Sequence, residues 1–179
     1  MKLKRIFSRI IFHLLKFFIK GISLFNHRMY MKLYIPLLKL YGMKIKGSPR
    51  YIGADVIFDD INKIKLGERV VISNECHFLT HDYSITTALI AVDKKPLTDI
   101  AIVRRIEVGD NVFIGKKSII MPGTIVGDNV IVGAGTVLRG KIESGSIIIG
   151  NPSQKVGDIY EQAKKWEKYL NTNFIRKDK

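Results

Sequence analysis

The chain has 179 residues, of which 46% are hydrophobic and 26% are charged, a balance that excludes a disordered or low-complexity protein. Its length suits one domain with an appendage and excludes two ordinary domains. Its net charge is +14, but residues 1–50 contain twelve Lys and Arg and no Asp or Glu, so the remainder is nearly neutral. Any partner attracted by this charge is therefore expected at the N-terminal segment.

Residues 2–20 have the pattern of a basic amphipathic helix. Basic or polar side chains recur there at spacings of three and four, and apolar side chains fill the positions between them. The charges interrupt any apolar run long enough to cross a bilayer, and no small-residue cleavage site follows, so neither a transmembrane helix nor a signal peptide is expected. A second helix is expected to end at Gly42. The two helices form a helical appendage over residues 1–46.

This appendage has two interpretations. In the first, residues 1–20 make a peripheral contact with the anionic inner face of the cell membrane, where each Lys or Arg contributes about 1 kcal/mol. In the second, the helices pack against the rest of the chain or a neighbouring subunit. A nucleic-acid partner is not expected, because the charge comes without zinc-ligand spacing, an aromatic RNA-binding motif or a helix-turn-helix pattern.

A repeat of six residues runs from Val108 to Glu143. In sixes the segment reads VGDNVF, IGKKSI, IMPGTI, VGDNVI, VGAGTV and LRGKIE. The first position is always aliphatic, the second is Gly in four of the six hexads, and the fifth is small or β-branched. Three such hexads close one triangular coil, with the first positions stacked inward. The expected fold class is therefore an all-β left-handed parallel β-helix of hexapeptide repeats.

The repeat extends upstream and is interrupted once. Hexads beginning at Leu66 and Ile72 are in register with Val108, and earlier ones fit a shifted phase, so the coil is expected to begin near residue 50. The pattern breaks over about residues 80–105, which predicts a loop extruded from a coil corner. The β-helix domain is expected to cover residues 47–156.

Residues 157–179 are expected to form a C-terminal helix and a tail. Apolar side chains recur along the first part of this segment at helical spacing, and the helix is expected to cap the end of the coil.

Three segments carry a resemblance to a known family: VVISNECHFLTHDYS, VGDNVFIGKKSIIMPGTIVGDNVIVGAGTV and IIGNPSQKV. From about Lys44 to Val156 the chain resembles the hexapeptide-repeat O-acetyltransferases, in particular the sugar acetyltransferases of capsule and lipopolysaccharide synthesis and the galactoside and maltose acetyltransferases. The resemblance implies a homotrimer that uses acetyl-CoA as acyl donor and a sugar-containing acceptor.

The same resemblance implies that His81 is the catalytic base. Acetyl transfer from a thioester to a hydroxyl needs a base that takes the hydroxyl proton, and a neutral imidazole can do this. Asp82 either orients His81 or is an ordinary solvated loop residue. His77 ends its hexad and is expected to point in a different direction. The other histidines lie in the appendage, so no third ligand is available for zinc and no metal is expected.

The resemblance also implies binding residues. The donor positions are Gly115, Lys116, Gly133 and Ala134, with Arg139 and Lys155 as phosphate contacts. Arg139 and Gly140 stand where the family usually has Thr-Lys, so the contact at this point differs from the family's. Lys116 could also be an ordinary solvated lysine. For the acceptor, Asp59 and Asp60 lie close to an acidic position that contacts sugar hydroxyls in the galactoside and maltose enzymes.

Three functions remain open at this stage. The first is O-acetylation of a sugar in a surface polysaccharide or in its lipid- or nucleotide-linked precursor. The second is N-acetylation of an amino sugar nucleotide or a xenobiotic, and the third is a β-helix scaffold without catalysis. The single cysteine, Cys76, cannot form an internal disulfide, so a cytoplasmic location is expected.

Overall fold

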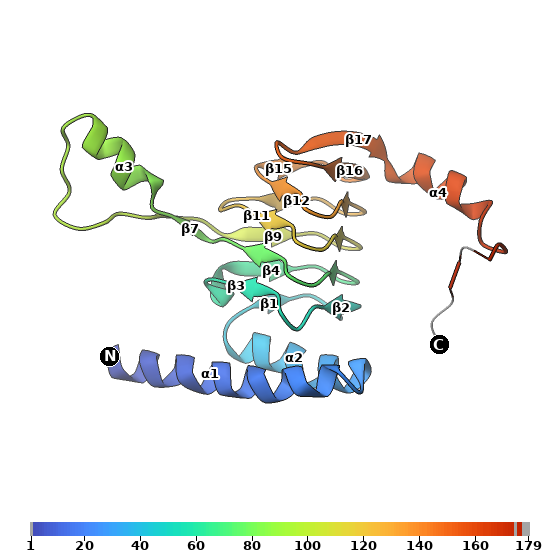
Figure 1. Ribbon diagram of the computed structural model, residues 1–179, viewed down its shortest axis with the longest axis horizontal. Helices are drawn as coiled ribbons and strands as arrows, with labels where there is room; N and C mark the ends of the chain where they lie inside the picture. The colour runs from blue at the N-terminus through green and yellow to red at the C-terminus, as the bar shows by residue number, and fades with distance from the viewer. Residues whose placement is uncertain (1, 174, 177–179) are drawn as a thin grey trace.

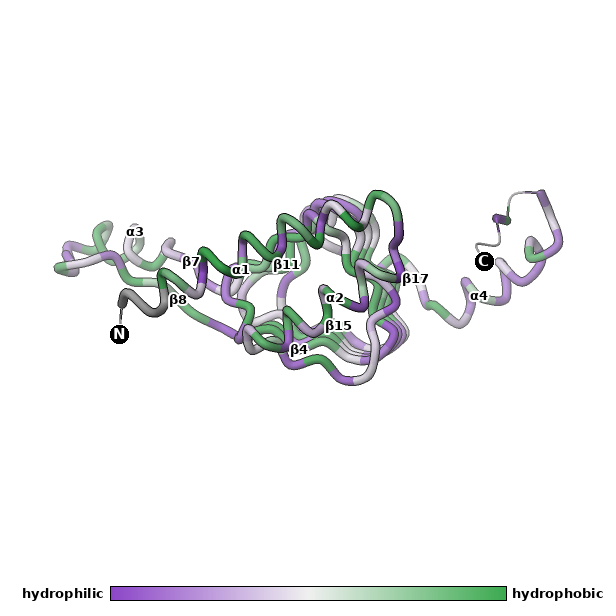
Figure 2. Tube along the Cα trace, turned by 90° about the horizontal axis from the view of Figure 1, so that it is seen from below, coloured by the Kyte–Doolittle hydropathy of each residue, from purple (hydrophilic) through white to green (hydrophobic). Residues whose placement is uncertain are grey.

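The computed structural model describes residues 2–173 and 175–176 of the chain, with side chains from residue 6 onward. Its main body is a column of short stacked strands that stands on two helices (Figure 1). These helices are α1 (Lys2–Ser23) and α2 (His27–Leu40). Seen from below, the successive coils of the column superimpose, and both helices cross its lower end (Figure 2).

Three parallel sheets form the sides of the column. The first sheet contains β1 (Lys44–Ile45), β4 (Ile64–Leu66), β9 (Ile106–Val108), β12 (Ile125–Val126) and β15 (Lys141–Ile142). The second sheet contains β2 (Tyr51–Ile52), β5 (Val71–Ile72), β10 (Phe113–Ile114), β13 (Ile131–Val132), β16 (Ser146–Ile149) and the antiparallel β17 (Gln154–Asp158). The third sheet contains β3 (Ile57–Phe58), β6 (His77–Phe78), β11 (Ile119–Ile120) and β14 (Val137–Leu138). The predicted left-handed parallel β-helix is thus confirmed.

The first coil begins earlier than the sequence suggested. Strand β1 pairs with β4 from Lys44, whereas the repeat predicted a start near residue 50. The hexad pattern missed this strand because Lys44 lies on the exposed side and only Ile45 is partly buried.

The interior of the column follows the hexad positions. The six first positions from Val108 to Leu138 are at most 3% exposed, so they form the expected inward ladder. The fifth positions explain why small side chains recur there. The hydroxyls of Ser118, Thr124 and Thr136 donate to the carbonyl three residues earlier, each at 2.7 Å, and so satisfy backbone groups at buried corners.

The second helix seals the lower end of this core. Tyr30, Tyr34 and Leu38 on α2 are at most 1% exposed, and the Asn26 side chain caps the helix by accepting from the Met29 amide at 2.9 Å. In α1, by contrast, Phe12 is the only side chain from residue 6 onward that is buried. The two predicted helices are present, and α2 contributes most of the helical side chains that are buried against the column.

Two stacked tyrosines of α2 give a matched test of buried hydrogen bonding. The Tyr30 hydroxyl donates to the Ile52 carbonyl at 2.9 Å, whereas the Tyr34 hydroxyl has no partner among the described residues. Burial raises the pKa of both phenols, so both are neutral donors. Tyr30→Phe should lower the free energy of unfolding by about 1 kcal/mol, while Tyr34→Phe should leave it unchanged or raise it. Guanidinium chloride unfolding measures both, and an equal loss in the two variants would contradict this assignment.

The interruption of the repeat is more ordered than a plain loop. A two-residue ribbon of β7 (His81–Asp82) and β8 (Ile102–Val103) leaves the column, and it carries the unpredicted helix α3 (Ser84–Ala91). A single 3-10 turn, Ile61–Lys63, lies at the same corner of the first coil. The column therefore resumes at β9 after an excursion that projects sideways (Figure 1).

The C-terminal helix does not cap the column, as the sequence had suggested. Helix α4 (Ile159–Glu167) extends away from the upper end (Figure 1), and the Trp166 side chain is 51% exposed. Strand β17 runs antiparallel along β16, so the chain leaves at the edge of the second sheet. There the Asp158 carboxylate accepts from the Tyr160 amide and starts the helix outside the column. No helix in the described part of the chain is long and apolar enough to span a bilayer.

Candidate active site

His81 lies where the chain leaves the third sheet. The preceding Thr80 is fully buried and fixes this exit point. Its hydroxyl donates to the Asp60 carboxylate at 2.7 Å and accepts from the Asp60 amide at 3.2 Å. On the C-terminal side of Thr80, His81 is held by backbone pairing with Val103 in the β7–β8 ribbon. The histidine is thus held by a rigid corner although it begins a projecting ribbon.

Two histidines and two aspartates converge at this corner. The Nε2 atom of His77 lies 2.8 Å from Oδ1 of Asp59. The Nδ1 atom of His81 lies 3.7 Å from Oδ2 of Asp59 and 3.5 Å from Oδ2 of Asp60. The expectation that His77 points away from His81 is therefore wrong. The ribbon turns the chain outward after Thr80 and brings both imidazoles to the same carboxylate.

This arrangement favours one tautomer of His81. Two carboxylates beside Nδ1 favour a hydrogen on that nitrogen, which leaves the lone pair on Nε2. Asp59 is only 14% exposed, so its field is less screened by water than that of a surface carboxylate. The corner can therefore accept a proton from a bound hydroxyl.

A cleft of about 430 Å³ opens beside His81. It is lined by Arg9, Phe12, His13, Tyr41, Phe58, Asp59, Asp60, Ile61, Asn62 and His81. The structure thus brings the predicted acceptor residues Asp59 and Asp60 together with the predicted base. It also adds side chains from α1 and from the end of α2. Sequence reasoning missed these, because no local pattern reports where an amphipathic helix docks.

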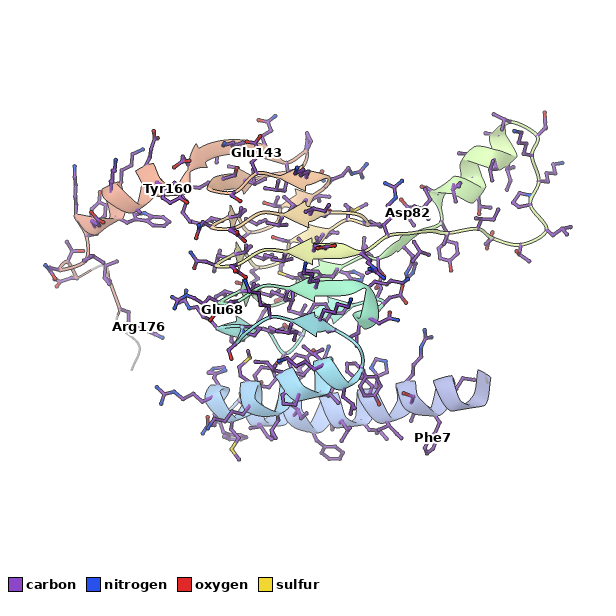
Figure 3. The ribbon with its side chains drawn as sticks, turned by 180° about the vertical axis from the view of Figure 1, so that it is seen from behind. Phe7, Glu68, Asp82, Glu143, Tyr160 and Arg176 are labelled. Carbon is purple, nitrogen blue, oxygen red and sulfur yellow. The ribbon has the colours of Figure 1, made fainter. Side chains whose placement is uncertain are left out.

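Asp82 does not take the orienting role considered for it. Its carboxylate accepts from the Ser84 amide at 2.8 Å, and this hydrogen bond lowers the pKa of Asp82. This bond closes a local turn at the start of α3, where Tyr83 is the N-cap residue, so the carboxylate is engaged there and not at the imidazole. Figure 3 shows Asp82 at the root of the projecting segment.

The predicted donor residues form one row along a different corner. Gly115, Gly133 and Ala134 lie between the second and third sheets in successive coils. A Cβ on Gly115 would lie 2.5 Å from the Ala134 amide nitrogen, so only glycine allows the coils to stack this closely. The row is therefore a place where successive coils contact each other directly through their backbones.

The charged residues expected at the donor phosphates are dispersed. The ammonium groups of Lys116 and Lys155 lie 2.8 Å and 3.7 Å from carboxylates of Glu75 and Glu143. These pairs are exposed and weak, so a phosphate could replace the carboxylates. Arg139 lies instead at the corner of His81, where it shares a cleft of about 230 Å³ with Asp82. The structure does not bring Arg139 and Lys116 together.

The third sheet separates the donor row from His81. The row precedes this sheet at one corner, and His81 follows it at the next. In one copy of the chain, the two halves of the candidate site therefore lie at opposite ends of the strands of the third sheet. Among the described residues, no group of three His, Cys, Asp or Glu side chains is arranged to hold a metal ion.

Comparisons with known proteins support the repeat and the fold. A family model described as bacterial transferase hexapeptide (six repeats) matches residues 105–140. Protein CapG from Staphylococcus aureus is 34% identical over 139 residues, which cover 72% of this chain and 78% of CapG. The putative lipopolysaccharide biosynthesis O-acetyltransferase WbbJ from Escherichia coli is 28% identical over 115 residues, or 60% of this chain. The aligned part spans 57% of WbbJ, little more than half of that relative.

A solved structure has the same architecture. The crystal structure of a hexapeptide-repeat acetyltransferase from Vibrio cholerae, complexed with acetyl-CoA, superposes with a TM-score of 0.60 at 18% identity. The superposition covers 83% of this chain and 85% of that one. At this identity the likeness establishes the fold.

Proposed function

The chain belongs to the hexapeptide-repeat acyltransferase family, and on that premise we propose that it transfers an acetyl group from acetyl-CoA to a sugar hydroxyl. The acceptor is a surface polysaccharide or its lipid- or nucleotide-linked precursor, in line with the role in lipopolysaccharide biosynthesis for which WbbJ is named. One observation carries the proposal. At the interrupted corner, His81 faces a cleft with two carboxylates beside its Nδ1 atom.

The proposed reaction uses His81 as a general base. Its Nε2 atom takes the proton of the acceptor hydroxyl while that oxygen attacks the thioester carbonyl carbon. Asp59 and Asp60 lie on the Nδ1 side of the ring, away from the atom that takes the proton. The tetrahedral intermediate then expels the CoA sulfur, and the proton on His81 passes to that sulfur. The products are the sugar ester and free CoA.

We propose that the active unit is a homotrimer in the cytoplasm. The separation of the donor row from His81 by the third sheet supports this, because a neighbouring copy can place its own row beside that histidine. A trimer with three equivalent contacts closes such a head-to-tail arrangement. In this assembly the donor lies along Gly115, Gly133 and Ala134. Its phosphates take the place of the Glu75 and Glu143 carboxylates beside Lys116 and Lys155.

A panel assay tests the proposal. The full chain is incubated with acetyl-CoA and matched pairs of soluble sugars that differ only in a hydroxyl or an amino group. Release of free CoA should depend on a hydroxyl-bearing sugar, and CoA alone should raise the melting temperature. Transfer only to amino groups would replace the proposal with N-acetylation. No transfer and no thermal shift would favour a non-catalytic scaffold.

A further inference from the structure

Helix α1 has an uncovered apolar face. Its members recur at helical spacing and are each 50–72% exposed: Ile6, Phe7, Ile10, Leu14, Phe17 and Phe18. We call these six residues the docking face. The turn that follows α1 adds Leu24 and Phe25, which are 81% and 91% exposed. Contiguous apolar surface of this kind on a folded protein usually marks an interaction site.

This face points away from the column. On the opposite side of α1, Phe12 is 8% exposed and the Lys16 ammonium donates to the Val56 carbonyl at 2.8 Å. These inward contacts fix the rotation of the helix. Figure 3 shows Phe7 projecting below the molecule, and Figure 1 shows α1 lying flat across the lower end. The docking face is therefore the underside of the protein.

The charge around the face identifies its partner. Residues 1–50 contain twelve Lys and Arg and no acidic residue, and of these Lys20, Arg28, Lys32 and Lys39 are exposed on α1 and α2. A second copy meeting this surface face to face would bring like charges together with no carboxylate of the appendage to balance them. An anionic bilayer offers both an apolar layer for the aromatic side chains and phosphates for the exposed cations of the two helices.

The other flank of α1 forms part of the candidate site. Arg9 and His13 line the cleft beside His81, together with Phe12. The outer face of α1 is thus suited to a bilayer, and its inner side lines the acceptor cleft. A sugar held at the bilayer surface by a lipid would reach His81 along this helix.

We propose that α1 docks the protein on an anionic lipid bilayer and thereby presents the cleft beside His81 to a lipid-linked sugar acceptor. The docking step stands independently of catalysis. The choice of acceptor rests on the proposed acetyl transfer and makes its substrate class more specific. The two parts are tested by separate measurements.

Vesicle sedimentation tests docking with the full chain. Wild type should bind vesicles of phosphatidylcholine with phosphatidylglycerol at least about tenfold more tightly than phosphatidylcholine alone, and high salt should weaken this binding. The triple variant Phe7→Ser, Leu14→Ser, Phe17→Ser should lose most of it. The matched control Val92→Ser, Leu97→Ser removes exposed apolar side chains from the projecting loop and should bind like wild type.

Three outcomes would overturn docking. They are absence of vesicle binding by wild type, equal binding to both kinds of vesicle, and unchanged binding by the triple variant. If the triple variant instead changes the mass measured by light scattering, while wild type ignores vesicles, the face is a contact between copies of the chain.

The acceptor class is tested with paired glycosides of a sugar that the soluble panel identifies. One glycoside carries a methyl group, and the other carries a hexadecyl chain embedded in anionic vesicles. The triple variant should acetylate the methyl glycoside at the wild-type rate and the embedded glycoside about tenfold more slowly. Equal rates of the variant and wild type on the embedded glycoside would overturn the lipid-linked acceptor. Loss of transfer to both glycosides by His81→Ala, with vesicle binding intact, would separate this result from the catalytic proposal.

Discussion

Replacing His81 by alanine is expected to lower the turnover number for acetyl transfer by about 10²–10⁴-fold, the usual contribution of a positioned general base. The side chain is 37% exposed and makes no short hydrogen bond that holds the corner, so the variant should remain folded. The loss should appear in the turnover number, while the affinity for CoA measured by calorimetry stays near that of wild type. Steady-state kinetics with the best acceptor of the panel measures the change.

His27→Ala is the matched control for this variant. His27 lies on α2 at the far end from the cleft and contacts the Tyr51 ring, with ring centroids 5.9 Å apart. Its replacement should leave the rate unchanged. If His81→Ala has the circular dichroism spectrum of wild type and still transfers acetyl as fast, His81 is not the base.

Replacing Ile120 by alanine is expected to lower the free energy of unfolding by about 2–5 kcal/mol. Ile120 is fully buried and stacks between Phe78 of the coil below and Leu138 of the coil above. A cavity at this point removes the contacts that both neighbours make with Ile120, and the close stacking of the coils limits relaxation. Denaturant unfolding at constant protein concentration measures the loss.

Ile125→Ala provides the comparison. Ile125 has the same chemistry but is 47% exposed, so its replacement should cost less than about 1 kcal/mol. A similar loss in both variants would contradict the inward ladder as the main source of the column's stability.

The column could be predicted because each hexad specifies one side of a coil, and the hexad recurs along the chain. The aliphatic first positions from Val108 to Leu138 each carry the same constraint, so agreement among six hexads outweighs any single exception. The hexad pattern did not predict the first strand at Lys44, because that strand has only one partly buried side chain. Helix α4 was expected to cap the column because an amphipathic pattern does not say against what its apolar face packs.

The candidate site was predictable only in part. The family resemblance predicts His81, Asp59 and Asp60 as site residues, and the structure brings them to one corner. Contacts that depend on where separate elements meet were not accessible from the sequence. His77 shares Asp59 because the chain turns outward after Thr80, and Arg9 reaches the cleft because α1 crosses the lower end of the column. Asp82 accepts from the Ser84 amide just before α3, a helix that the broken repeat did not reveal.

The proposed acetyl transfer is tested most directly by a crystal structure of the full chain with bound CoA. We predict that the pantetheine arm runs along Gly115, Gly133 and Ala134 of one copy and that the sulfur lies beside His81 of a neighbouring copy. The sulfur should leave room for a hydroxyl within about 3 Å of the imidazole Nε2 atom. A structure in which CoA binds elsewhere, or in which its sulfur lies far from every copy of His81, would contradict the proposal.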